Sequence, residues 1–316
     1  MNVTGWASIF NLGLVHPAAY PKAVGDRDTL LESIRRIVTD PFFGAIEITH
    51  ISEDAVRNEV ASLLDTGGQE VVYLAASVMM RQQLNLSSLS ATERSSAVSQ
   101  LKSLIDEAYA FGAQLFLVGS GPDPGPSSRE AAKEQLVESL NELCAYARKL
   151  AKEPIIITLE NYDRDIDKRF LLGPTSEAVE VARRVLKEHP NFGLTIDQSH
   201  LYQLGEDPAC VLPEAMDVIV HIHLANCSLD RELPWFGDQH PRFGIAGSKV
   251  GVKEMASFLS ILMQAGYFER QHVMALPVIS LEVKPWENEE PEAVVANAKR
   301  TLLRAWAEVC GCQSFS

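Results

Sequence analysis

Short apolar runs rich in β-branched residues alternate along the chain with longer segments of helical periodicity. This alternation is typical of successive strand–helix units that build a parallel sheet. Eight such pairs can be counted, with strands predicted over 3–9, 45–49, 71–75, 114–118, 155–160, 192–196, 218–223 and 278–283. The clearest helices are predicted over 28–38, 93–111, 129–150, 177–189, 252–265 and 291–309, with shorter ones around 54–64 and before 210–214.

The even spacing of these units favours a closed barrel over an open, doubly wound sheet. No Gly-x-Gly-x-x-Gly turn, which would bind a dinucleotide in an open sheet, follows the first predicted strand. The Pro- and Gly-rich clusters at 119–126 and 237–251 fall where strand-to-helix loops belong, so none of them indicates an interdomain linker. The sequence therefore predicts a (β/α)8 TIM barrel that forms a single domain over 1–316.

Composition limits the class of partner. The chain has 316 residues and is 46% hydrophobic, enough to bury a large core. Its 28 Lys and Arg residues are outnumbered by 42 Asp and Glu residues, for a net charge of -14. Such a charge repels phosphate backbones and anionic lipid, so we expect neither nucleic acid nor a membrane surface as partner.

The N-terminal segment and the cysteines indicate a cellular compartment. Residues 1–20 lack the basic stretch of a secretory signal, and no later run is long enough to span a bilayer. The five cysteines are scattered, without paired Cys-x-x-Cys spacing, so neither a disulfide framework nor a zinc knuckle is indicated. We expect a cytoplasmic protein.

Polar residues end each of the last four predicted strands. They are Glu160, Asp197, His223 and Glu282. Active sites of barrels lie at the carboxyl ends of the strands, so these side chains are expected to converge. Three carboxylates and an imidazole in one partly dry pocket repel or desolvate one another unless a cation lies between them. The pattern therefore predicts a divalent-metal site.

Each of these residues also has a simpler interpretation. A glutamate at a strand end is often solvated or paired with a base, and an Asp197–His200 spacing of three also suits a helix N-cap. His221 lies on the same strand face as His223, because side chains alternate with period two, but deeper in the barrel. For His221 we expect a hydrogen-bonded core role. The four strand ends taken together favour the metal site.

The long loop after the seventh strand carries another possible ligand pair. Asp238 and His240 are one residue apart, a spacing that suits chelation from an extended segment but equally suits an ordinary polar lid. The Gly and Pro content of 233–251 suits a mobile segment, so we expect this loop to close over the pocket and bring Asp238 or His240 to the metal or the substrate.

Five short motifs identify a family resemblance. They are Gly-Ala-Ile-Glu47-Ile, Leu-Glu160-Asn, Ile-Asp197-Gln-Ser-His200, His-Ile-His223-Leu-Ala-Asn226 and Ser-Leu-Glu282-Val. On these motifs nearly the whole chain resembles the xylose isomerase-like barrels, a group of sugar isomerases and ketose epimerases that also includes endonuclease IV.

The resemblance to the epimerases implies specific roles. It implies that Glu160, Asp197, His223 and Glu282 bind a metal, and it places His200 beside the substrate oxygens. Glu47, Asp238 and His240 are expected to bind substrate as well. The sequence departs from the family pattern in having Asn226 after the seventh strand, where an acidic residue is common, and in the substrate-binding arginine, which is displaced to about Arg231. Manganese is the first choice of metal on this resemblance, and Mg, Co or Zn also suit oxygen and imidazole ligands.

The endonuclease branch fits less well. It needs histidines at the ends of strands three and four, where this sequence has Leu-Ala-Ala-Ser77 and Leu-Val-Gly119-Ser120. A full trinuclear zinc site therefore cannot assemble, and the acidic net charge independently opposes DNA binding.

The predicted function is isomerisation or epimerisation of a small carbohydrate. Glu160 and Glu282 would remove and return a proton, through an enediolate that the metal stabilises. Two other functions stay open: a metal-dependent hydrolase or lyase with a second ion at Asp238 and His240, and a sugar-binding barrel without catalysis. An assembly of identical chains stays open too.

Overall fold

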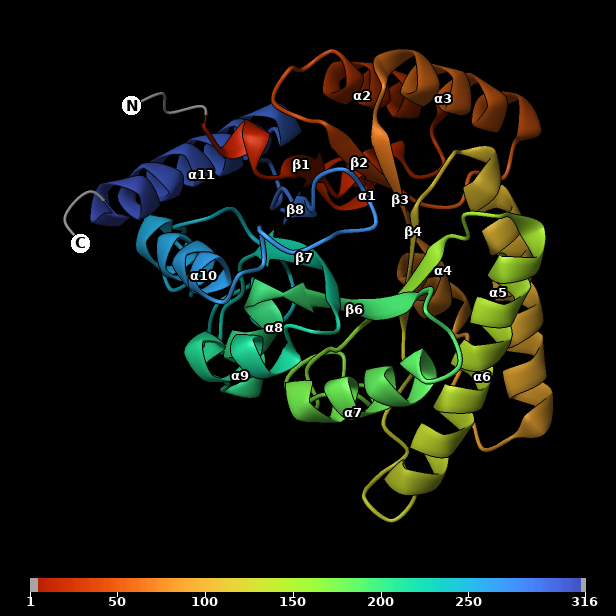
Figure 1. Ribbon diagram of the computed structural model, residues 1–316. Helices are drawn as coiled ribbons and strands as arrows, with labels where there is room; N and C mark the ends of the chain where they lie inside the picture. The colour runs from red at the N-terminus through yellow and green to blue at the C-terminus, as the bar shows by residue number, and fades with distance from the viewer. Residues whose placement is uncertain (1–4, 314–316) are drawn as a thin grey trace. The chain divides into compact units, whose positions relative to one another are not determined.

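The computed structural model describes residues 5–313 and contains eight strands in that range (Figure 1). They are β1 (Asn11–Leu14), β2 (Ala45–Ile48), β3 (Glu70–Leu74), β4 (Leu115–Gly119), β5 (Ile156–Glu160), β6 (Phe192–Asp197), β7 (Ile219–Ala225) and β8 (Val278–Glu282). They form one sheet in the order β1-β8-β7-β6-β5-β4-β3-β2, and β1–β8, β7–β8 and the pairs from β3 to β6 are parallel. This is the strand order of the predicted (β/α)8 barrel, which is confirmed.

Helices connect the strands, and several strand-to-helix connections contain more than one. The 3-10 helices are η1 (Gly5–Ser8) and η2 (Pro21–Ala23). The α-helices are α1 (His16–Ala19), α2 (Arg27–Val38), α3 (Asp54–Gly67), α4 (Ala75–Gln82), α5 (Ala91–Ala110), α6 (Arg129–Leu150), α7 (Thr175–Leu186), α8 (Gln198–Leu204), α9 (Pro208–Ala215), α10 (Val252–Gln264) and α11 (Pro291–Gln313).

The described chain divides into two compact units. The first comprises 5–45, 197–217 and 222–313, and the second comprises 46–196 and 218–221. The first unit holds most of the predicted site: Asp197, His200, His223, Arg231, Asp238, His240 and Glu282. The second holds Glu47, Glu160 and His221. The single-domain boundary of 1–316 stays a prediction.

The first strand is the main correction to the sequence-based elements. A strand was expected over 3–9, but Gly5–Ser8 is a 3-10 helix and β1 begins at Asn11, while 3–4 lie outside the described residues. The apolar residues here are buried by ring contacts instead, because Trp6 packs on Phe10 at 5.3 Å and Phe10 packs on Trp306 at 5.6 Å between ring centroids.

Close backbone approach explains why Asn11-Leu12-Gly13-Leu14 forms the strand. A Cβ on Gly13 would lie 2.4 Å from the Ser280 hydroxyl oxygen of β8 and 3.3 Å from the Ser280 Cβ, so a larger residue there would displace the Ser280 side chain. On the other side of β1, the backbone N of Gly44 donates to the carbonyl of Leu12 at 3.0 Å. The β1–β8 pairing and this hydrogen bond position β8, and therefore Glu282 at its end.

In the second unit, long amphipathic helices cover the strands. Figure 1 shows α5 and α6 side by side, and the Tyr109 hydroxyl of α5 donates to the Ala147 carbonyl of α6 at 2.9 Å. The buried positions of α6 recur at helical spacing: Ala132, Leu136, Leu140, Leu143 and Ala147. This buried face packs on β5, the strand that ends at Glu160.

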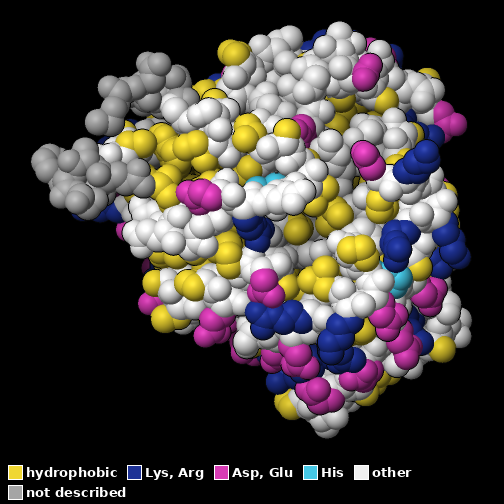
Figure 2. All heavy atoms as spheres, in the orientation of Figure 1, with side chains coloured by type: hydrophobic (Ala, Val, Ile, Leu, Met, Phe, Trp, Pro, Cys, Tyr) yellow, Lys and Arg dark blue, Asp and Glu magenta, His cyan; other side chains and the backbone are white. Residues whose placement is uncertain are grey.

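Charged side chains of both signs are mixed over α6 and α7 (Figure 2). Arg184 of α7 lies 2.5 Å from Glu134 of α6, and Lys133 lies 3.8 Å from Glu177. Such alternation gives no continuous basic stripe on this face of the second unit. Within the described residues, no helix is both long and apolar enough to cross a bilayer.

Candidate metal centre

Three ligand candidates meet at the strand ends of the first unit. His223 of β7 places its Nδ1 atom 3.0 Å from Oε2 of Glu282, at the end of β8, and 3.8 Å from Oδ2 of Asp197, at the end of β6. Asp197 and His223 are fully buried, and the Glu282 side chain is 14% exposed. Donor atoms bound to one cation at roughly 2.0–2.2 Å lie about 3–4 Å from one another, so the spacing fits a metal.

Asp197 uses its two oxygens differently. Oδ1 accepts a hydrogen bond from the backbone N of Ser199 at 2.5 Å and caps α8, as a helix N-cap does. Oδ2 is buried and has no hydrogen-bond partner among the residues that the structure describes. A buried carboxylate oxygen without a donor is costly unless a cation satisfies it. The N-cap and the ligand interpretations of Asp197 are therefore compatible.

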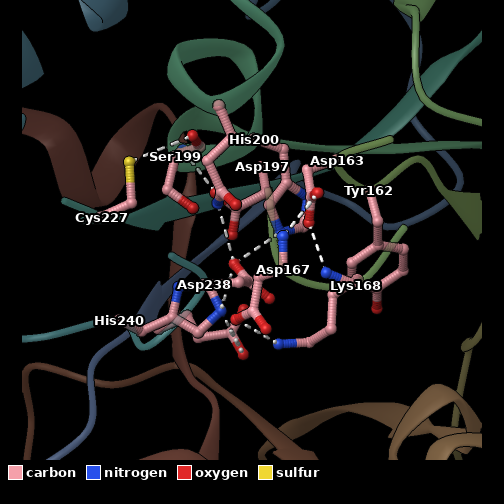
Figure 3. A network of polar contacts seen from close by, with 12 residues as sticks. Tyr162, Asp163, Asp167, Lys168, Asp197, Ser199, His200, Cys227, Asp238 and His240 are labelled. Carbon is pink, nitrogen blue, oxygen red and sulfur yellow. Dashed lines mark hydrogen bonds and ion pairs between the residues drawn. The ribbon is translucent and has the colours of Figure 1, made fainter. Parts of the chain in front are cut away.

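A second group of side chains surrounds Asp238 (Figure 3). Oδ1 of Asp238 lies 3.0 Å from Nε2 of His200 and 3.3 Å from Nε2 of His240, and it accepts a hydrogen bond from the Gln203 amide at 3.1 Å. Ligand atoms of Asp197, His200 and His240 also lie within 4.8 Å of one another. The first unit thus has donors for substrate oxygens or for a second cation.

His240 links the two groups. Its Nε2 atom is 3.6 Å from Oε1 of Glu282, and its carbonyl accepts a hydrogen bond from the Lys284 backbone N at 2.7 Å. Its φ is +45°, in the left-handed region, and it precedes Pro241, which narrows the allowed backbone further. Strain of this kind is held by surrounding structure and is concentrated at functional sites.

Hydrogen bonds between side chains and backbone groups hold the loop that carries Asp238 and His240. Asn226, just after β7, donates from its amide to the Arg242 carbonyl at 3.0 Å and accepts from the Val250 backbone N at 2.7 Å. Ser228 and Gly237 form an antiparallel bridge, and Ser228 Oγ donates to the Gly247 carbonyl. The loop already lies at the site in this conformation, and whether it also opens and closes stays a prediction.

In the second unit, Glu160 ends β5 as predicted and is only 2% exposed. Its Oε2 atom accepts a hydrogen bond from the Tyr162 hydroxyl at 2.5 Å. Its Cα pairs with those of Gly119 on β4 and Thr195 on β6. The carboxylate therefore belongs to a fixed strand end rather than to a solvated loop.

Glu47 has a buried partner in this unit. Its Oε1 atom lies 3.2 Å from Nε2 of His221, and neither side chain is exposed. His221 Nδ1 lies 3.3 Å from the Thr195 hydroxyl, which is hydrogen-bonded to the Thr158 hydroxyl at 2.8 Å. These contacts fit the hydrogen-bonded core role expected for His221. They involve one Glu47 oxygen, Oε1, and the substrate-binding role of Glu47 stays a prediction.

Arg231 is exposed to solvent, unlike the other predicted site residues of the first unit. Its guanidinium packs over the Phe236 ring at 5.1 Å from the ring centroid. A cation–π contact of this kind suits a surface turn. The substrate-binding role of Arg231 stays a prediction.

Two residues at the site were missed from the sequence. Tyr162 lies two positions beyond the end of β5, and its contact with Glu160 comes from the turn that follows the strand. Gln203 is three positions after His200 on α8, so helical spacing placed the two side chains together. A search restricted to ionisable strand ends overlooks both.

Cys227 lies close to the first-unit site but does not join the donors. Burial raises the pKa of its thiol, and the nearby Asp238 and Asp197 raise that pKa further. Its Sγ atom lies 3.4 Å from the Ser199 carbonyl oxygen. The candidate ligand groups among the described residues consist of carboxylate oxygens and imidazole nitrogens, which hard or borderline divalent cations prefer.

Solved structures share this fold at low sequence identity. A D-tagatose 3-epimerase-like protein superposes with a TM-score of 0.71 at 19% identity, covering 95% of this chain and 98% of that one. The IOLI protein with a binding zinc atom has a TM-score of 0.70 at 15% identity, covering 95% and 99%. An AP endonuclease of family 2 from Brucella melitensis has a TM-score of 0.65 at 17% identity, covering 91% and 96%.

Among curated protein sequences, none matches the chain significantly. The family model described as the xylose isomerase-like TIM barrel matches residues 40–305. That span takes in seven of the eight strands and all the predicted site residues. The predicted family is therefore confirmed: this chain belongs to the xylose isomerase-like TIM barrels.

Proposed function

We propose that this chain is a divalent-metal-dependent isomerase or epimerase of a small carbohydrate. The observation that carries the proposal is the grouping of His223, Asp197 and Glu282, with one buried Asp197 oxygen that lacks a hydrogen-bond partner among the described residues. The fold shared with a D-tagatose 3-epimerase-like protein supports the reaction class. A bound divalent cation would supply the positive charge that lowers the cost of a developing enediolate.

We propose Glu160 as the fourth ligand. Glu160 pairs with Thr195 in the β5–β6 register, and Asp197 lies two residues farther along the same β6 strand. Parallel strands that pair in this way bring their carboxyl ends to one edge of the sheet. The donor set would then be three carboxylates and one imidazole, a composition suited to one divalent ion.

Glu160 and Glu282 are our candidates for the proton transfer. They end β5 and β8, which are separated by β6 and β7 in the sheet order, so they can face opposite sides of a planar enediolate. Glu282 is the more accessible of the two, with 14% of its side chain exposed, which suits contact with an entering substrate. A positioned carboxylate acting as acid or base typically contributes about 100- to 10,000-fold to the rate.

The remaining polar side chains would bind substrate oxygens. His200, Asp238 and Gln203 form a connected group beside His240, and donor–acceptor pairs of this kind match vicinal hydroxyls. Manganese is our first choice for the metal on the family resemblance alone, and Mg, Co or Zn are alternatives because oxygen and imidazole nitrogen donors suit all four. We place the activity in the cytoplasm, since the four cysteines with described side chains are free.

A screen of ketoses, aldoses and their phosphates in deuterium oxide tests the reaction. We expect a true substrate to take up deuterium at the carbon next to its carbonyl, without loss of mass. A cleaved or hydrolysed product with no deuterium at carbon would contradict the proposal and favour the second candidate.

That second candidate is a metal-dependent hydrolase or lyase with two ions. The specific observation in its favour is the approach of Asp238 to His200 and His240, at 3.0 and 3.3 Å, beside the first group. A second ion there would help to activate water. Metal titration separates the two, because two tightly bound ions per chain favour the hydrolase or lyase.

A further inference from the structure

The Glu160 carboxylate is held by a neighbour on its own strand end. The Tyr162 hydroxyl donates to Oε2 of Glu160 at 2.5 Å, a short, charge-assisted hydrogen bond. Only 4% of Tyr162 and 2% of Glu160 are exposed. A phenol that donates to a buried carboxylate limits the rotation of that carboxylate. It also occupies one of the two carboxylate oxygens, so the other oxygen is the one that faces further partners.

The position of the Tyr162 ring is built into the fold. A Cβ on Gly119 would lie 3.5 Å from the Tyr162 ring and 2.9 Å from the Phe170 ring, so glycine makes room for both. Phe170 packs on Tyr162 with ring centroids 4.8 Å apart. The Tyr162 backbone N donates to the Leu172 carbonyl at 3.1 Å. Tyr162 is therefore fixed by packing on one side and by backbone pairing on the other.

The loop that supplies Phe170 is fixed as well. The fully buried Asp163 carboxylate accepts hydrogen bonds from the backbone N atoms of Ile166, Asp167 and Lys168 at 2.6, 2.8 and 2.6 Å. Figure 3 shows the bond from the Lys168 backbone N to Asp163, whereas the Lys168 side chain extends toward Asp167. The Phe170 backbone N donates to the Asp163 carbonyl at 3.0 Å. These hydrogen bonds hold Phe170 in the position where its ring packs against Tyr162.

We propose that Tyr162 is a positioning residue that holds Glu160 through Oε2 and so makes Oε1 the atom that binds the metal. This inference rests on the proposed function, in which Glu160 is a ligand. Outer partners of this kind orient a ligand and tune its donor strength. Without the phenol, the carboxylate is free to rotate and to bind the cation through both oxygens.

The test compares Tyr162→Phe with wild type and with Tyr146→Phe. Tyr146 is a matched control, because its hydroxyl also donates to a carboxylate, Asp106, at 2.9 and 3.1 Å, but on the exposed surface of the same unit. Metal-free protein is titrated with Co²⁺ at 25 °C, under conditions where all three proteins have the same circular dichroism spectrum. The dissociation constant and the visible absorption of bound Co²⁺ are measured.

For Tyr162→Phe we expect affinity for Co²⁺ to fall about 10- to 100-fold, the usual cost of losing an outer partner. We also expect the visible absorption of its bound Co²⁺ to weaken, because a second oxygen of Glu160 would join the donor set and raise the coordination number. Tyr146→Phe should match wild type in both. A Tyr162→Phe protein with wild-type affinity and spectrum would overturn the positioning role alone. A wild-type protein that binds no Co²⁺ would overturn the proposed function and this inference together.

Discussion

The imidazole of His223 lies 3.0 Å from the Glu282 carboxylate, measured from Nδ1 to Oε2. The two residues come from neighbouring parallel strands, β7 and β8, whose register pairs His223 with Ser280 and Ala225 with Glu282. Glu282 thus reaches back by two positions toward His223. Oδ2 of Asp197 lies 3.8 Å from the same Nδ1 atom, so two carboxylates approach one imidazole nitrogen, an arrangement that a shared cation would stabilise.

Asp197→Asn separates the two roles of that residue. Asparagine caps helices as well as aspartate, so the unfolding free energy of the metal-free protein should change by less than about 1 kcal/mol. Metal affinity should fall by more than the roughly 10- to 100-fold caused by losing an outer partner, because a direct ligand is lost. Calorimetric titration measures the affinity.

Asp207→Asn is the control for that substitution. Asp207 caps α9 by accepting from the Ala209 backbone N at 3.0 Å. Its asparagine variant should bind metal like wild type. Equal affinity in the Asp197→Asn and Asp207→Asn proteins would mean that Asp197 only caps α8.

Glu282→Gln should reduce turnover of an identified substrate by about 100- to 10,000-fold, since the amide keeps the shape of the side chain but cannot take a proton. Metal content is measured in the same preparation, because Glu282 is also a proposed ligand. Glu290→Gln, an exposed glutamate of the following loop, should retain full turnover. Wild-type turnover by a fully loaded Glu282→Gln protein would exclude Glu282 as acid or base.

The chemistry of the strand ends was predictable, because each ends an apolar run with a polar residue. That reasoning predicted Glu160, Asp197, His223 and Glu282 as ligands. Period two placed His221 on the same strand face as His223, and its deeper position predicted a core role. Pairing between distant segments was not predictable. His240 approaches Glu282 because backbone contacts fold the intervening loop and hold His240 at a positive φ.

The prediction of the first strand was wrong for a related reason. The apolar residues around Trp6 and Phe10 match the composition of a strand, but aromatic contacts with the distant Trp306 bury them. The strand itself is shorter and contains Gly13, which sequence scales disfavour in strands. Only the close approach of Ser280 explains that glycine.

Thiol reactivity should follow burial. Burial raises the pKa of Cys144 to about 12, and Cys227 is buried with a raised pKa as well, whereas Cys210 is exposed. A thiol reagent at pH 8 should therefore modify Cys210 in the native protein and leave Cys144 and Cys227 intact. Mass mapping of the modified peptides checks this. Rapid labelling of Cys144 in folded protein would contradict the described packing.

His16 should make the metal-free protein less stable as the pH falls. Burial lowers the pKa of His16 to about 4, below the 6.5 of an exposed histidine, and its Nε2 atom lies 2.9 Å from the Ser33 hydroxyl oxygen. Between pH 6.5 and 4 the unfolded chain binds the proton and the folded chain does not, so stability falls by up to about 3 kcal/mol.

Denaturant unfolding at several pH values measures this effect. His16→Gln, which cannot take up that proton, should flatten the pH dependence between 6.5 and 4 relative to wild type. An unchanged slope would show that His16 titrates normally in the folded protein.

The metal content of the purified protein bears most directly on the proposed site. Elemental analysis of wild type, after reloading with a mixture of Mn, Mg, Co and Zn and removal of weakly bound ions, should give one divalent ion per chain. His223→Ala, which removes the imidazole between Asp197 and Glu282, should reduce that value to near zero. A wild-type protein with no bound ion, or a His223→Ala protein that keeps its ion, would contradict the metal centre.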